Sequence, residues 1–128
     1  MKDIETVEDI RLLVDEFYAE VRLDPVIGYI FNAALNNRWS IHLEKMYRFW
    51  QTVLLAEHTY SGSPFLPHAK MPLEQKHFNT WLKIWHTTVD KNFIGAKAEE
   101  AKWRGDKMAI MFFSKIEYYR INNLKPLI

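Results

Sequence analysis

The sequence predicts an all-α protein, and its periodicity is the main observation behind that prediction. Apolar residues recur at helical spacing along most of the chain, and no alternating strand pattern extends over more than a few residues. The chain also lacks internal repeats and low-complexity linkers. Its 128 residues are enough for one core that buries about two-thirds of the unfolded surface. We therefore expect a single domain over residues 1–128.

Thr6 and Asp9 predict a capping box at the start of the first helix, since each side chain can bind the backbone N–H of the other residue. One apolar face follows at positions i, i+3, i+4, i+7 and i+11, formed by Ile10, Leu13, Val14, Phe17 and Val21. Tyr18 lies beside that face, directly after Phe17.

A second, short helix is expected to begin with Asp24 as its N-cap and Pro25 in the first helical position, and to end at Asn36 and Asn37. It carries Ile27, Ile30 and Phe31. A third helix is expected from about Ser40. Its inward face repeats at i, i+4, i+7 and i+11, with His42, Met46, Phe49 and Val53.

The segment from Thr59 to Met71 is expected to be a loop that is long enough to be functional. Pro64, Pro67 and Pro72 allow at most a brief helical turn between them, because proline fixes φ and has no N–H. His68 is therefore expected on a short, stiff piece of backbone.

A fourth helix is expected from Pro72, with Phe78, Trp81, Leu82, Trp85 and Val89 on one face. Gly95 separates it from a last helix that runs from Ala96 to about Asn122. Gly105 weakens the middle of this helix by about 1 kcal/mol relative to alanine. The part before Gly105 could therefore form a separate piece.

Composition excludes several classes of protein. The 17 basic and 16 acidic residues leave a formal charge of +1, which gives no electrostatic case for nucleic-acid binding. The absence of cysteine rules out disulfides, Cys-ligated metal centres and thioether-linked haem. No apolar leader and no membrane-spanning stretch occurs, so we expect a cytoplasmic protein that is not bound to a membrane.

Motifs for phosphate binding and zinc hydrolysis are also absent. Glu74 and His77 form one Glu-x-x-His motif, whereas a di-iron bundle needs two such motifs and further glutamates. No pattern supports a serine nucleophile. His58 and His86 are expected at the surface.

Four residues on separate elements could carry chemistry together: Tyr18, His42, His68 and Trp81. A haem iron held by one axial histidine leaves its opposite face open to a gas molecule. A phenol O–H, an imidazole N–H and an indole N–H would stabilise that ligand by hydrogen bonding in a dry pocket. Taken singly, each residue has a plainer explanation: His42, Tyr18 and Trp81 as core, and His68 as an exposed loop residue.

The ordered set of motifs resembles the truncated haemoglobins, most closely group III, from about Asp9 to Phe93. The resemblance rests on Phe17-Tyr18-x-x-Val21-Arg22, Ile30-Phe31-Asn32, Trp39-x-x-His42, Phe49-Trp50, Tyr60-x-Gly62-x-Pro64, His68 and His77-Phe78-x-x-Trp81-Leu82. The diglycine motifs of other truncated globins are missing, as they are in that group. The last helix matches in character more than in its residues.

The resemblance implies a two-over-two helical sandwich around non-covalent haem b. His68 falls at the proximal iron ligand, and Tyr18, His42 and Trp81 fall at polar distal positions. Lys70 or His77 could meet a haem propionate. The residues expected around the cofactor are Phe31, His42, Met46, Phe49, Phe65, His68, Lys70, Met71, His77, Phe78 and Trp81.

The expected function is the binding of O₂ and other diatomic ligands (NO, CO), with three distal donors favouring slow O₂ release. A haem enzyme that performs NO dioxygenation or peroxidase-like chemistry, with an unknown reductase, is the alternative. A haem-free helical interaction module is a third possibility. His42 could also bind the iron itself in the resting state.

Overall fold

The computed structural model describes residues 1–62, 68 and 71–122, and it confirms the all-α prediction. Within these residues the chain forms helices and no strand. The helices are α1 (Val7–Leu23), α2 (Gly28–Leu35), α3 (Trp39–Leu55), α4 (Gln75–Asn92) and α5 (Ala96–Asn122).

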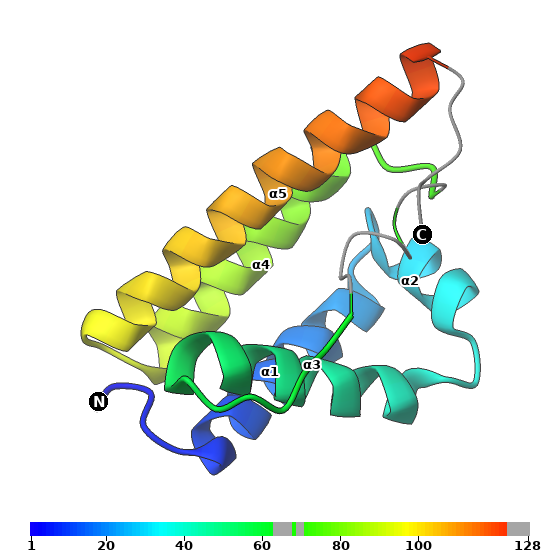
Figure 1. The fold of residues 1–128 in the computed structure, drawn as a ribbon. Coiled ribbons are helices and arrows are strands. Elements are labelled where there is room, and N and C mark those ends of the chain that lie inside the picture. The colour runs from blue at the N-terminus through cyan, green and yellow to red at the C-terminus, as the bar shows by residue number, and fades with distance from the viewer. Residues whose placement is uncertain (63–67, 69–70, 123–128) are drawn as a thin grey trace.

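The helices form two packed pairs, with α1 at the centre of the arrangement. The longest helix, α5, lies along α4, and α1 packs against α3 (Figure 1). Helix α1 also contacts α4 and the short helix α2, so it joins the two pairs. This arrangement is the two-over-two sandwich that the resemblance implied.

Helix α1 forms as the sequence predicted. The Thr6 hydroxyl accepts from the Asp9 N–H at 3.2 Å, and the Asp9 carboxylate accepts from the Thr6 N–H at 3.0 Å. Tyr18 is buried along with the predicted apolar stripe, so the inward face is wider than that stripe.

Two helix starts differ from the prediction. Asp24 does cap, but its carboxylate accepts from the Val26 and Ile27 N–H groups at 2.7 and 3.0 Å. These bonds close a turn, and α2 begins only at Gly28. A Cβ at Gly28 would lie 2.9 Å from the Arg22 carbonyl oxygen, so glycine lets α2 start against the end of α1. Helix α4 begins at Gln75 rather than Pro72, because Glu74 is extended and acts as its N-cap.

Gly105 does not divide the last helix, which is continuous from Ala96 to Asn122. Its place is explained by packing: a Cβ there would lie 2.7 Å from Cδ1 of Trp85. Glycine lowers helix propensity at this position, but it allows α5 to pack closely against the Trp85 indole.

The N-terminal segment fastens the start of α5. The Asp3 carboxylate accepts from the Lys97 N–H at 2.9 Å and from the Ala98 N–H at 2.8 Å. Asp3 thus caps a helix that begins more than ninety residues later in the chain. Figure 1 shows the N-terminus beside the turn between α4 and α5.

Asp3→Ala is expected to lower the free energy of unfolding by about 1–2 kcal/mol, because the Lys97 and Ala98 N–H groups at the start of α5 lose their acceptor. Urea unfolding followed by circular dichroism measures the change. Glu5→Ala is the matched control, since Glu5 is an exposed carboxylate in the same segment and pairs with Lys2 at the surface. Equal losses in both variants would contradict the capping role.

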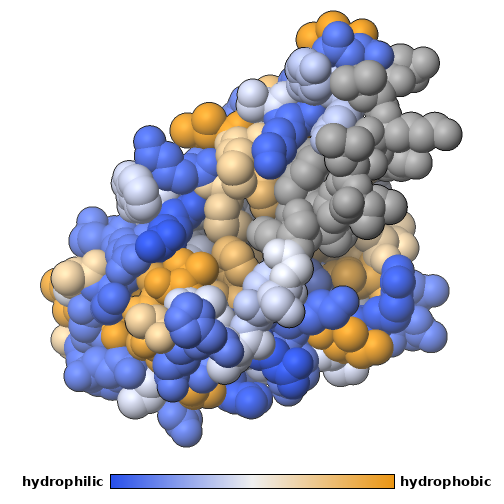
Figure 2. Space-filling model, viewed as in Figure 1, coloured by the Kyte–Doolittle hydropathy of each residue, from blue (hydrophilic) through white to orange (hydrophobic). Residues whose placement is uncertain are grey.

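The outer surface mixes polar and apolar side chains. On the face in Figure 2, hydrophilic residues surround separate hydrophobic patches. Among the helices of the described ranges, none has the length and apolar character needed to cross a membrane.

Candidate functional site

One largely apolar cavity lies between the two helix pairs. The cavity is lined from every helix and from His68: Phe17, Tyr18, Ile27, Phe31, His42, Met46, Phe49, Trp50, His68, Leu73, His77, Phe78, Trp81, Met108, Ala109 and Phe112.

Tyr18 and His42 meet on one wall of the cavity, where their rings are 5.0 Å apart and nearly perpendicular. Burial raises the pKa of the Tyr18 phenol above its ordinary value, so the hydroxyl keeps its proton. Burial, with smaller effects from His68 and Lys45, lowers the pKa of His42 to about 4. Both side chains are therefore neutral hydrogen-bonding groups at physiological pH.

Nε2 of His42 is buried and has no hydrogen-bond partner among the described residues. A buried polar atom without a partner is rare, because it costs about 1–3 kcal/mol. The atom therefore indicates a ligand that would complete its bonding.

Trp81 lies on α4 and packs edge-to-face with Phe17, at 5.3 Å between ring centroids. Phe31, Met46 and Phe49 come from α2 and α3 and supply apolar lining. Thus the three expected distal donors and this lining do border the same space.

His68 lies on the loop before α4, and its ring is 5.1 Å from that of Phe112 on α5. It borders both the cavity and the outer hollow described below. A charge on His68 lowers the pKa of His42, as expected for two imidazoles that border one cavity. Phe65 and Lys70, which the sequence also assigned to the cofactor, lie outside the described residues.

His77 has a structural role that the sequence analysis did not foresee. Its Nδ1 accepts from the Glu74 N–H at 2.8 Å, which explains the Glu-x-x-His spacing as a helix cap. Nδ1 is then an acceptor, so the ring proton is on Nε2. That Nε2 is buried and has no partner in the described part of the chain. Burial lowers the pKa of His77, which therefore borders the cavity as a neutral N–H donor.

A more polar hollow adjoins the cavity and shares Phe31, His42, Met46 and His68 with it. Its cations are Arg38, Lys45 and Arg48, with Tyr60 and Met71 also on its wall. The sequence analysis missed these cations, although Arg38, His42 and Lys45 follow the i, i+4, i+7 spacing of one helix face.

Helix α5 also contributes residues that the sequence analysis did not assign: Met108, Ala109 and Phe112. Their spacing places them on the inner face of α5. Trp103, Ile110 and Met111 are apolar residues of α5 that are exposed, so hydropathy alone did not distinguish its inner face. His58 is exposed, and His86 is half-buried and pairs with Asp106 at 2.7 Å; neither borders the cavity.

These residues fit a flat, apolar cofactor with acidic groups at one edge. The cavity is apolar, two of its imidazoles have unpartnered buried nitrogens, and the hollow at its mouth carries three cations. No three His, Cys, Asp or Glu side chains of the described ranges gather to hold a bare metal ion. The histidines that border the cavity in that part of the chain are consistent with a metal that takes one histidine ligand from the protein, as the iron of haem does.

Comparison with known proteins agrees with this reading. The profile of the family described as bacterial-like globin matches residues 3–113. Group 3 truncated hemoglobin ctb of Campylobacter jejuni is 36% identical over 87 residues, covering 65% of this chain and 68% of that protein. The crystal structure of a group III truncated hemoglobin from the same species has a TM-score of 0.82 and 30% identity, covering 91% of this chain and 95% of that chain. The chain therefore belongs to the bacterial-like globin family and has the fold of the group III truncated haemoglobins.

Proposed function

We propose that the protein binds haem b in this cavity, with His68 as the iron ligand, and holds O₂, NO or CO on the side of Tyr18, His42 and Trp81. Family membership supports a globin-type haem protein. The observation that carries the proposal is the unpartnered, buried Nε2 of His42 in the same cavity as His68. Haem supplies the iron that holds a diatomic ligand.

The protein's own groups act on that ligand through hydrogen bonds in a dry space. The hydroxyl of Tyr18 is protonated, and the imidazole of His42 is neutral because of its lowered pKa. Both groups therefore offer donors without placing a full charge in the cavity. Trp81 adds an indole N–H, and the apolar lining excludes water, which strengthens each of these bonds.

The acidic edge of the cofactor would face the outer hollow. Arg38, Lys45 and Arg48 can pair with carboxylates there, and His77 can donate from Nε2. Lys45 and Arg48 are three residues apart on α3, so they lie on neighbouring turns and can share one anionic edge.

Tyr18→Phe and Trp81→Phe are each expected to speed O₂ release by about 10–100-fold. The reason is the loss of one hydrogen bond to a partly charged ligand, worth about 1.5–3 kcal/mol. Flash photolysis or stopped-flow mixing of the haem-loaded variants measures the dissociation rate. Tyr29→Phe is the control, because Tyr29 is exposed on α2 and does not border the cavity. Unchanged rates in both pocket variants would remove these residues from ligand stabilisation.

A further inference from the structure

Two of the aromatic ring pairs in the described part of the core are nearly parallel, and both contain Trp85. The Trp50 and Trp85 indoles lie 4.6 Å apart at an interplanar angle of 23°. Trp81 and Trp85 are 6.0 Å apart at 16°. The other described ring pairs are tilted or edge-to-face, which is the usual preference of aromatic side chains.

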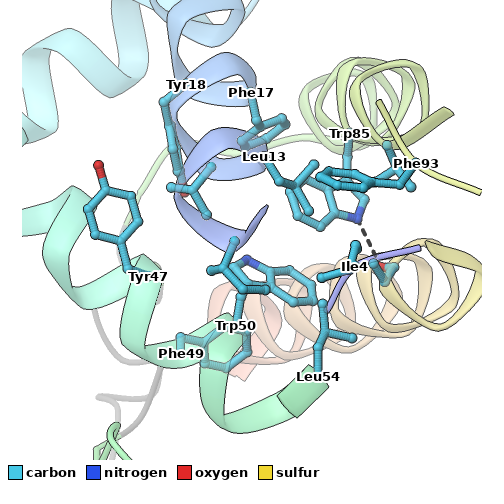
Figure 3. Close-up of a cluster of buried hydrophobic side chains, with 14 of the residues drawn as sticks. Ile4, Leu13, Phe17, Tyr18, Tyr47, Phe49, Trp50, Leu54, Trp85 and Phe93 are labelled. Atoms are coloured by element: carbon cyan, nitrogen blue, oxygen red, sulfur yellow. Dashed lines mark hydrogen bonds between the residues drawn. The ribbon is translucent and has the colours of Figure 1, made fainter. Parts of the chain in front are cut away.

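This indole stack, defined as Trp50, Trp81 and Trp85, is held in place by neighbours on α1 and α5. Phe17 of α1 packs its edge on Trp81 and Trp85. Gly105 of α5 leaves the room that Trp85 occupies. Nε1 of Trp85 donates to the Ala101 carbonyl oxygen at 2.9 Å, the bond drawn in Figure 3.

The stack borders the cavity at two of its members, Trp50 and Trp81, whereas Trp85 is 1% exposed and lies behind them. From Trp50 a chain of rings continues outward. Phe49 is 5.2 Å from Trp50 and 5.4 Å from Tyr60, and Tyr60 lies on the wall of the outer hollow. Aromatic rings in close contact thus connect the cavity to its polar mouth, with the oxidisable Trp50 and Tyr60 on either side of Phe49.

We propose that the indole stack is an electron-donor site that takes oxidising equivalents away from the cavity, with Tyr60 as the outlet. This inference rests on the proposed function, since it needs haem in the cavity. Parallel indoles share a positive charge over several rings, which makes the stack easier to oxidise than a single indole. The Ala101 carbonyl dipole also stabilises a cationic Trp85, which offsets part of the cost of its burial.

The oxidant in the proposed step is hydrogen peroxide, which takes up two electrons and two protons and is reduced to two molecules of water. The stack gives up one electron at a time and becomes a tryptophan radical cation. Tyr60 then returns an electron to the stack, releases its phenolic proton to water and becomes a neutral tyrosyl radical. A one-electron reductant in solution, such as ascorbate, restores Tyr60 by supplying an electron, and water returns the proton. Two such passages balance one peroxide.

The test starts from the haem-loaded protein, whose absorption spectrum is recorded before peroxide is added. After mixing with peroxide and rapid freezing, electron paramagnetic resonance is expected to show a tryptophan radical that is followed by a tyrosyl radical. Peptide mass spectrometry is expected to find oxygen added to tryptophans of the stack, despite their burial, and less of it when ascorbate is present.

Trp85→Phe is expected to remove most of the tryptophan radical and to reduce oxidation at Tyr60. Trp39→Phe is the matched control, because Trp39 is also buried and aromatic but meets Tyr18 edge-on, outside the stack. Tyr60→Phe is expected to prolong the tryptophan radical and suppress the tyrosyl signal.

Oxidation confined to Trp39, the exposed Trp103 or methionines would overturn the proposal. This measurement uses the parent protein, so it does not depend on whether any variant folds. Tyrosyl signal from Tyr60 that persists in Trp85→Phe would also overturn it, because the electron would then pass directly across the hollow. If the untreated protein retains no haem, the proposed function fails and the relay fails with it. If haem is retained and the radical lies elsewhere, only the relay fails.

Discussion

His68→Ala is expected to abolish the axial histidine spectrum and to weaken haem retention by at least about 100-fold. Loss of a mere outer partner of a metal ligand already costs about 10–100-fold, and His68 is proposed as the ligand itself. The His68 side chain borders both the cavity and the hollow, so the substitution removes an imidazole from the place where the two spaces meet. Absorption spectra and transfer of haem to an acceptor globin measure the two effects.

His58→Ala is the matched control for this experiment, because His58 is exposed and does not border the cavity. Circular dichroism of the haem-free variants separates loss of the ligand from loss of the fold. Imidazole added to His68→Gly is expected to restore the axial spectrum by filling the space of the missing side chain. An unaltered axial spectrum in His68→Ala would assign the iron ligand to another residue.

The sequence predicted the helices well because their signals are local. The capping box at Thr6 and the spacing of the apolar stripe on α1 each involve residues within a few turns of one another. The starts of α2 and α4 were wrong by a few residues for a related reason. Asp24 and Pro72 are both residue types that commonly start helices. The Asp24 carboxylate instead accepts a hydrogen bond within a turn that precedes α2, and the N-cap of α4 is Glu74.

Features that depend on contacts between distant residues were the ones that sequence analysis missed. Asp3 caps α5 across almost the whole chain. Gly105 looked like a weak point of its helix, and only the position of Trp85 gives its reason. The stacking of Trp50 on Trp85 likewise brings together rings from α3 and α4, which no local pattern encodes.

The same limit applies to the site. From sequence, only the resemblance placed Tyr18, His42 and Trp81 around one cavity, because each of these residue types also occurs in apolar cores. The structure adds what periodicity cannot, namely that Nε2 of His42 and Nε2 of His77 are buried without partners. Such atoms distinguish a cofactor cavity from a core that is merely aromatic.

His42 is expected to make the protein without haem progressively less stable as the pH falls from 6.5 to about 4. Its folded pKa of about 4 lies below the unfolded value of 6.5, so in this interval the unfolded chain binds the extra proton. Stability therefore rises with pH through the interval and is lost on acidification. The lowered pKa corresponds to a loss on the order of 3 kcal/mol at the acid end.

Urea unfolding of the haem-free protein across this interval, compared with His42→Leu, isolates the contribution of His42. The leucine variant cannot titrate at this position, so its stability is expected to fall less steeply with pH. The lowered pKa values of His77, Asp3, Asp9 and Glu100 add a slope of the same sign in both proteins. His58→Gln, at an exposed histidine, is expected to follow the parent protein. If His42→Leu and the parent lose stability in parallel, His42 is not desolvated in the folded chain. The argument that its buried Nε2 lacks a partner until a ligand binds would then fail.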